Sequence, residues 1–221
     1  PYGRIIETAS EAGHLDLALR LSEHLDDGDG LAVTAMARGF ARGNRLRDLQ
    51  PLFQGRGESE SMYAFVIGPV YVELGRDAEL DALIDKIEQR PQPEAIASWH
   101  VEGHLRAGRR DKALEILLGL TDKERDLVVH AASQALVYGE QPALAYPLAQ
   151  FITGEESYHI GLKARIAEAV RDQGLAQSLV PPLTRMSAED KEFVTGDVVA
   201  ALAASGGWKD AVELTKTMQP K

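Results

Sequence analysis

Apolar residues recur every three or four positions along most of this chain, in short segments that are separated by turns containing glycine. The segment EAGHLDLALRLSEHL (11–25) returns in altered form as RAGRRDKALEILLGL (106–120) and as ASGGWKDAVELTKTM (204–218). A spacing of three to four residues is the period of an amphipathic helix. The alternation that is typical of strands is almost absent, so the pattern predicts an all-α protein.

The glycines at these turns are regularly spaced. Seven of them lie 30 to 35 residues apart: Gly13, Gly43, Gly75, Gly108, Gly139, Gly174 and Gly206. Glycine suits a tight turn between helices because it adopts positive φ without a steric penalty. Regular spacing of this kind indicates internal repeats, so we expect about seven antiparallel helix–turn–helix units of about 32 residues each.

A small residue follows the turn at a fixed distance in the clearest units. Ala18, Ala113 and Ala211 each lie five residues after the glycine. A small side chain at this position would let the second helix of the unit approach its neighbour closely.

Prolines distinguish three other units. Pro51, Pro147 and Pro182 each lie eight residues after a turn glycine. Proline costs about 3 kcal/mol inside a helix but little in the first turn. We therefore expect the second helix of these units to begin only about three residues before each proline. Pro69 lies in the middle of a helical pattern, where we expect a kink or a break.

These features together resemble the tetratricopeptide repeat. EAGHLDLA, RAGRRDKA and SGGWKDA look like the small-residue turn and second-helix alanine of that family, which also favours a small residue at the position of Gly68. The family's tryptophan–leucine signature is mostly missing, and Sel1-like and pentatricopeptide repeats remain alternatives. The resemblance implies one α-solenoid domain over residues 1–221 with a right-handed superhelical path, as a module of a longer protein.

The resemblance also implies a concave groove that is lined by residues of the first helices. The expected partner-binding residues are Val33, Ala37, Phe40, Met62, Phe65, Val72, Ser98, Glu102, Arg106 and Ser133. Such a groove is mostly apolar, with few charges, and would suit a peptide or a helix. The same apolar positions would also fit an ordinary helical core.

Patterns that could support catalysis or metal binding are weak. His100 and His104 lie four residues apart on one helix face, which is a usable spacing for metal ligands, but no third ligand is evident nearby. The chain has no cysteine, and it contains no G-x-S-x-G, P-loop or G-x-G-x-x-G motif. We expect no catalytic residues, no metal and no cofactor.

The charge of the chain narrows the possible partners. Lys and Arg number 24 and Asp and Glu number 34, a formal net charge of −10. This charge disfavours nucleic acids and anionic membrane surfaces, and no apolar run approaches the roughly 20 residues of a membrane span. The compartment stays open, with the cytoplasm slightly favoured, because this chain could lack a targeting segment.

The sequence therefore predicts a non-enzymatic scaffold that binds a protein or peptide partner. Self-association of the solenoid is the main alternative and is compatible with partner binding. An α/α enzyme is less favoured, because it would need long loops that carry paired carboxylates and aromatic residues. A solenoid that reads RNA bases is disfavoured by the negative charge.

Overall fold

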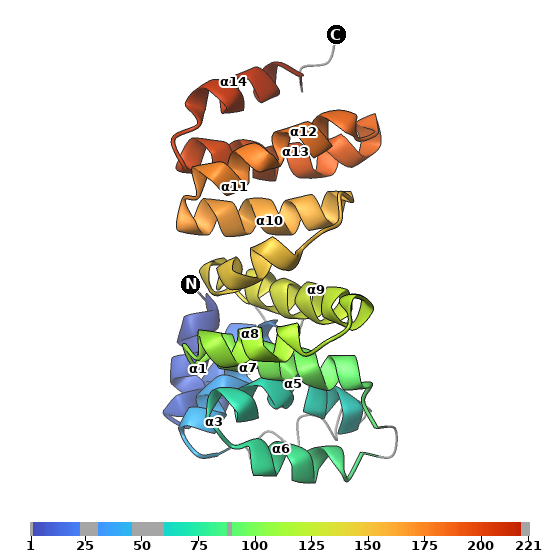
Figure 1. Cartoon of the computed structure of the whole chain (residues 1–221). Helices are drawn as coiled ribbons and strands as arrows, with labels where there is room; N and C mark the ends of the chain where they lie inside the picture. The colour runs from blue at the N-terminus through green and yellow to red at the C-terminus, as the bar shows by residue number, and fades with distance from the viewer. Residues whose placement is uncertain (1, 23–30, 46–59, 88–89, 218–221) are drawn as a thin grey trace. The chain divides into compact units, whose positions relative to one another are not determined.

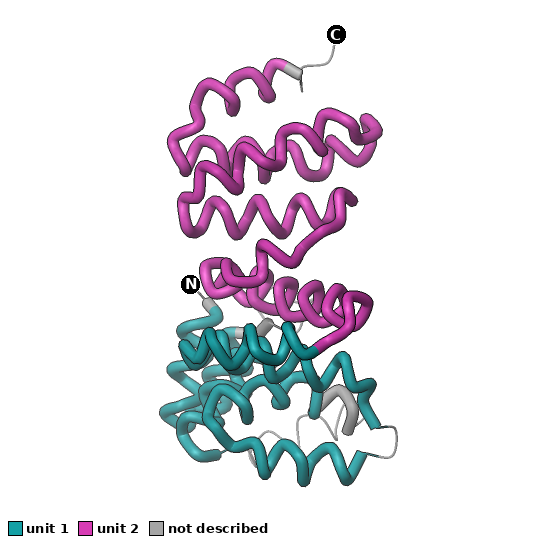
Figure 2. The backbone as a smooth tube through the Cα atoms, in the orientation of Figure 1, with its two compact units in different colours: residues 1–119 teal, residues 120–221 magenta. Residues whose placement is uncertain are grey.

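The chain is all-helical in the computed structural model, which describes residues 2–22, 31–45, 60–87 and 90–217. Within these ranges every regular element is a helix and no strand forms, so the predicted fold class is confirmed at this level. The chain forms two compact units, unit 1 (Pro1–Gly119) and unit 2 (Leu120–Lys221) (Figure 1, Figure 2). Each has a core of its own and is described by itself.

Unit 1 is a series of helices that pack on their neighbours along the chain. Its described helices are α1 (Tyr2–Glu11), α2 (Leu15–Ser22), α3 (Leu31–Arg42), α5 (Glu60–Glu73), α6 (Asp77–Ile84), α7 (Pro93–Arg106) and α8 (Arg110–Leu118). Helix α1 packs on α3, α3 on α5 and α5 on α7, while α2, α6 and α8 pack against α1, α5 and α7 in turn. The longer helices thus form one layer and the shorter ones cover them.

Unit 2 repeats this arrangement with more irregular second helices. It contains α9 (Asp122–Tyr138), the 3-10 helix η2 (Pro142–Phe151), α10 (Ser157–Val170), α11 (Gln173–Ser178), α12 (Val180–Arg185), α13 (Ala188–Ala204) and α14 (Trp208–Thr217). Helix α10 packs against both α9 and α13, and α14 packs against α13. A capping box forms at the start of α9, where Glu124 N donates to Thr121 Oγ1 (3.4 Å) and Thr121 N donates to Glu124 Oε2 (2.9 Å).

The same backbone turn ends a helix at seven places in the described ranges. Each turn contains one residue with positive φ: Gly13, Asn44, Gly75, Gly108, Glu140, Arg171 and Gly206. The next N–H donates to the carbonyl five residues earlier, as in His14 N to Ala9 O (2.8 Å) and Gly207 N to Leu202 O (2.7 Å). This pattern is the Schellman motif, which satisfies the last carbonyls of a helix.

At three of these turns the residue with positive φ is not the glycine that the sequence predicted. Asn44 and Glu140, each one residue after a glycine, take the positive φ in place of Gly43 and Gly139. Gly174 lies inside α11, and Arg171 has a φ of 55° at that turn. The hydrogen bonds of the motif hold these residues in a conformation that their side chains disfavour.

The buried small residue after the turn is more regular in this corrected register. Five residues after a positive-φ residue, Ala18, Ala113 and Ala211 are buried as predicted. Ala145 and Ala176 occupy the same position after Glu140 and Arg171, and both are fully buried. The spacing from the glycines does not reveal these two alanines, because the positive φ is at Glu140 and Arg171 rather than at Gly139 and Gly174.

The prolines behave in different ways. Pro182 lies in the first turn of α12, as predicted, and splits the second helix of its unit into α11 and α12. Pro147 lies inside η2, which begins at Pro142 and is a 3-10 helix, so the expected late α-helix does not form. The expected break at Pro69 does not occur, because α5 continues through it. Pro51 lies outside the described residues.

Candidate functional site

Most of the residues that were predicted to line a groove lie in the interior of their unit. Side chains are buried at Ala37, Phe40, Val72, Ser98, Glu102 and Ser133. Val33 is half-buried, and the side chain of Met62 lies outside the described residues. Phe65 is exposed, and its ring packs edge to face on Trp99, with centroids 5.9 Å apart. A buried side chain already contacts its own chain, so Phe65 is the member best placed to meet a partner.

Unit 1 also contains a cluster of charged side chains, most of them buried, that spans four helices. Arg106 Nε donates to Glu102 Oε1 at 2.7 Å, and these side chains are 3% and 9% exposed. Arg42 of α3 pairs with Glu7 of α1 and with Glu73 of α5 (3.2 Å). The cluster therefore links α1, α3, α5 and α7 through their charged side chains.

Arg38 lies at the centre of this cluster. Burial lowers the pKa of Arg38 to about 10, helped by the nearby cation of Arg106 and opposed by the carboxylates Glu102, Glu73 and Glu7. Arg38 Nε and Glu73 Oε2 are buried without a hydrogen-bond partner among the described residues. With Arg42, the cluster has three arginines, and the carboxylates around them are Glu7, Glu73, Glu102 and, beside Arg42, Glu11, so the described charges form an internal ion network.

The two histidines with metal-ligand spacing have other contacts. Arg109 Nε donates to His104 Nδ1 at 3.0 Å, and His100 Nδ1 lies 3.9 Å from a carboxylate oxygen of Asp77. Within the described ranges, no group of three or more His, Asp or Glu is arranged to hold a metal ion. The guanidinium of Arg109 also donates to the carbonyls of Val72 and Glu73, so it stabilises the C-terminal end of α5.

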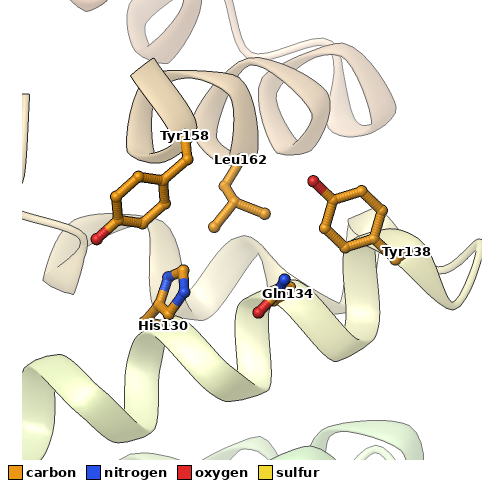
Figure 3. A pocket seen from close by; sticks show the side chains of 5 residues that line it. All are labelled: His130, Gln134, Tyr138, Tyr158 and Leu162. Carbon is orange, nitrogen blue, oxygen red and sulfur yellow. The ribbon is translucent and has the colours of Figure 1, made fainter. Parts of the chain in front are cut away.

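A small pocket opens between α9 and α10 in unit 2. It encloses about 200 Å³ and is lined by His130, Gln134, Tyr138, Tyr158 and Leu162. Figure 3 shows Tyr158 and Leu162 pointing from α10 toward α9, where His130, Gln134 and Tyr138 face them. Both tyrosines are largely exposed, while Leu162 is buried. The pocket thus has an apolar base and a rim of aromatic and polar groups.

Aromatic and charged contacts fix the shape of this pocket. The ring of His130 packs edge to face on Tyr158 (4.8 Å between centroids), and Tyr158 lies 3.9 Å from the ring of His159. Arg165 lies over the ring of Tyr138 at 5.4 Å and pairs with Asp197 of α13 at 3.4 Å. The two tyrosines are therefore held in place before any partner binds.

His130 is the polar group inside the pocket. Its Nδ1 is buried and has no hydrogen-bond partner in the part of the chain that the structure describes. Burial lowers the pKa of His130, and the nearby His159 lowers it further. The imidazole is therefore neutral near pH 7, with one ring nitrogen that donates and one that accepts a hydrogen bond.

The first helices of unit 2 expose a row of large apolar side chains. Leu127, Tyr158 and Phe193 are 51%, 49% and 76% exposed and lie on α9, α10 and α13. Each lies thirteen residues before a positive-φ turn residue, at Glu140, Arg171 and Gly206. We call these three residues the apolar row. None of these three residues was predicted from the sequence. The register of Leu127 and Tyr158 is visible only when residues are counted from Glu140 and Arg171, whereas Phe193 lies thirteen residues before Gly206, a turn glycine that the sequence does reveal.

No protein-family model matches this chain, and no curated protein matches it either. In the described ranges, no helix combines the length and the apolar character needed to cross a membrane.

Proposed function

We propose that this chain is a non-enzymatic scaffold that binds a protein partner through the first helices of unit 2. The apolar row carries the proposal. Three large apolar side chains are exposed at one register position on helices that pack in series, α9 with α10 and α10 with α13. Large apolar side chains that are exposed at equivalent positions of packed helices can together form an interaction surface. The pocket between α9 and α10 adds a concave anchor point beside Tyr158.

The proposal includes a tetratricopeptide-like architecture of about seven stacked helical hairpins. Support comes from the Schellman turn that recurs at seven places and from the buried alanine five residues after most of these turns. A stack of such hairpins presents its first helices along one continuous face, since each hairpin buries its apolar side against the next. A row of exposed side chains on that face suits an extended or helical segment of another protein.

Affinity capture with matched variants tests the proposal. We would compare the wild-type chain, a Tyr158→Glu, Phe193→Glu double variant and a Trp208→Glu variant in lysate of the source organism. Trp208 is the control because it is an equally exposed aromatic residue (65%) on the second helix α14. A partner that the wild type and Trp208→Glu retain but the double variant loses would support the proposal. Equal recovery by all three forms, with unchanged helicity, would contradict it.

Self-association is a second candidate function, which the outer face of α14 favours. Trp208 and Val212 lie one helical turn apart on this helix and are 65% and 52% exposed. An apolar pair of this kind could contact a second copy of the chain. Sedimentation of wild type and Trp208→Glu distinguishes the two candidates: self-association through α14 predicts a smaller species for the variant, and a monomer in both forms excludes it.

A further inference from the structure

The volume of the pocket between α9 and α10 limits what it can hold. It encloses about 200 Å³, whereas sites for small molecules and cofactors usually enclose roughly 300–1,000 Å³. The pocket is therefore smaller than a usual site for a cofactor. It is of the order of one large amino-acid side chain, which is how anchor residues of protein interfaces are received.

The lining of the pocket favours an apolar anchor. Leu162 and the rings of Tyr138 and Tyr158 supply apolar surface, and His130 and Gln134 supply neutral polar groups. Arg165, a cation beside the pocket, already lies over Tyr138 and pairs with Asp197. An acidic anchor would have to break this pair, so a carboxylate is disfavoured as the group that enters.

The charge beside the apolar row favours cations in the flanking residues of the partner. Glu124 and Asp190 lie three residues before Leu127 and Phe193, which is one turn along the same helix face. Glu156 lies two residues before Tyr158 and pairs with His159 at 2.6 Å. Residues 120–221 carry ten Lys and Arg against fourteen Asp and Glu, a formal net charge of −4. Lys or Arg in the partner would thus meet a negative potential at this face.

We propose that the pocket receives one aromatic or leucine side chain from a segment of a partner protein that carries Lys or Arg on either side of this anchor. The inference rests on the proposed function, and it adds the chemistry of the partner. In this mode of binding, the pocket would supply most of the affinity, and the carboxylates Glu124, Glu156 and Asp190 would orient the partner. The phenol rings of Tyr138 and Tyr158 would contact the anchor from two sides of the pocket.

Three labelled peptides of equal length test the proposal on the full chain. In one, a central Phe is flanked by Lys, and in another by Glu; a third peptide replaces the Phe of the Lys-flanked form by Ala. We expect the Lys-flanked Phe peptide to bind most tightly, by fluorescence anisotropy. The Glu-flanked and Ala forms should bind at least about tenfold more weakly, and the charge effect should shrink as salt is added.

A pocket-filling variant locates the binding. Gln134 is exposed at the rim, so Gln134→Trp fills the pocket without disturbing the core, and Gln150→Trp on η2 is the matched control. We expect Gln134→Trp to weaken the Lys-flanked Phe peptide about tenfold or more and Gln150→Trp to leave its affinity unchanged. In wild type, amide NMR shifts on adding this peptide should concentrate in residues 130–138 and 158–162.

Three results would overturn the proposal: equal affinity for all peptides, an unchanged affinity in Gln134→Trp, or no binding of the Lys-flanked Phe peptide at millimolar concentration. The capture experiment with Tyr158→Glu, Phe193→Glu separates this failure from a failure of the proposed function. A partner that still depends on the apolar row would leave the scaffold in place and exclude only the basic, pocket-anchored segment.

Discussion

At the scale of single residues, close helix contacts depend on glycine at a few positions. A Cβ at Gly103 of α7 would lie 2.5 Å from the carbonyl oxygen of Pro69 and 2.6 Å from Cβ of Val72, both on α5. A Cβ at Gly196 of α13 would meet no atom within 4 Å. The same substitution should therefore have opposite effects at the two positions.

We expect Gly103→Ala to lower the free energy of unfolding by about 1–3 kcal/mol, because backbone atoms of α5 would have to move. Gly196→Ala should raise it by up to about 1 kcal/mol, because alanine is the better helix former and no contact opposes it. Urea unfolding followed by circular dichroism measures both changes. An unchanged free energy of unfolding in Gly103→Ala would mean that α5 and α7 pack less closely than the structure shows.

The buried ion pair between Glu102 and Arg106 gives a second prediction at this scale. Arg106→Met should cost about 3 kcal/mol, since it removes the cation that is hydrogen-bonded to the buried carboxylate of Glu102 and leaves Arg38 as the remaining nearby cation. Glu102→Gln added to Arg106→Met should recover a large part of this loss, because no uncompensated charge then stays buried. A full double-mutant cycle measures the coupling. Additive effects of the two substitutions would show that the pair is not coupled.

His130 gives a prediction about pH. Burial lowers its pKa from the ordinary value of 6.5, so the folded chain binds this proton less readily than the unfolded chain does. Above pH 6.5 the contribution of His130 to the free energy of unfolding is therefore fully present. As the pH drops through and below that value, the unfolded chain binds the proton first, so the free energy of unfolding falls. The groups around it are Tyr158, His159 and the carboxylate of Glu156, which pairs with His159.

Between pH 7 and pH 5, we expect the melting temperature of His130→Gln to fall less than that of the wild type. Above pH 7, the difference in melting temperature between the two forms should be constant. Thermal melts at matched ionic strength measure this. The remaining pH dependence should include His104, whose pKa is also lowered, first by burial. An identical pH profile in both forms would show that His130 does not titrate differently in the folded state.

At the scale of elements, the Schellman turn is the feature that the chain repeats most faithfully. Gly108 and Arg171 have nearly the same role, with φ of 72° and 55°. Glycine adopts this conformation freely, whereas an arginine pays a steric penalty that its turn hydrogen bonds offset.

We expect Arg171→Gly to raise the free energy of unfolding by about 0.5–1 kcal/mol and Gly108→Ala to lower it by about 1 kcal/mol. Both effects are smaller than the backbone strain alone would give, because glycine increases the entropy of the unfolded chain. Denaturant unfolding of both variants checks the signs. A destabilising Arg171→Gly would indicate that the arginine side chain makes a contact worth more than the strain.

Elements of this kind were predictable from the sequence only in part. Helical periodicity predicted the all-α class, and the alanine at position 18, 113 or 211 predicted a buried small residue. The turns at Asn44, Glu140 and Arg171 were not predictable from glycine, because hydrogen bonds of the motif and packing of the flanking helices override the local preference.

The candidate site was less predictable than the fold. Apolar residues such as Phe40 fit both a core and a groove in the sequence, and burial decides between them. Leu127 lies beside the buried Val128 on α9, so apolar character alone does not reveal that one of them is exposed. The pocket joins residues from α9 and α10, and this pairing follows from the packing of two helices rather than from any local motif.

At the scale of the whole molecule, a hairpin that repeats would also repeat the surface that it exposes. One hairpin cannot bury its apolar side alone, so hairpins are expected to stack. When the register of the turns is constant, any side chain at a given distance from the turn recurs along one face. In unit 2 this places Leu127, Tyr158 and Phe193 at equivalent positions, and we propose that a partner protein binds them together.

The central claim is that a partner binds the apolar row, and the most direct test is the Kd of the captured partner for purified variants. Calorimetry would compare the wild type with Tyr158→Glu, Phe193→Glu and with Trp208→Glu, each checked for helicity and melting temperature. We predict a Kd at least about tenfold higher for the double variant, because charged side chains would replace apolar ones that the complex buries. The Kd of Trp208→Glu should be unchanged. The same Kd for all three folded proteins would contradict the claim and place the binding surface elsewhere.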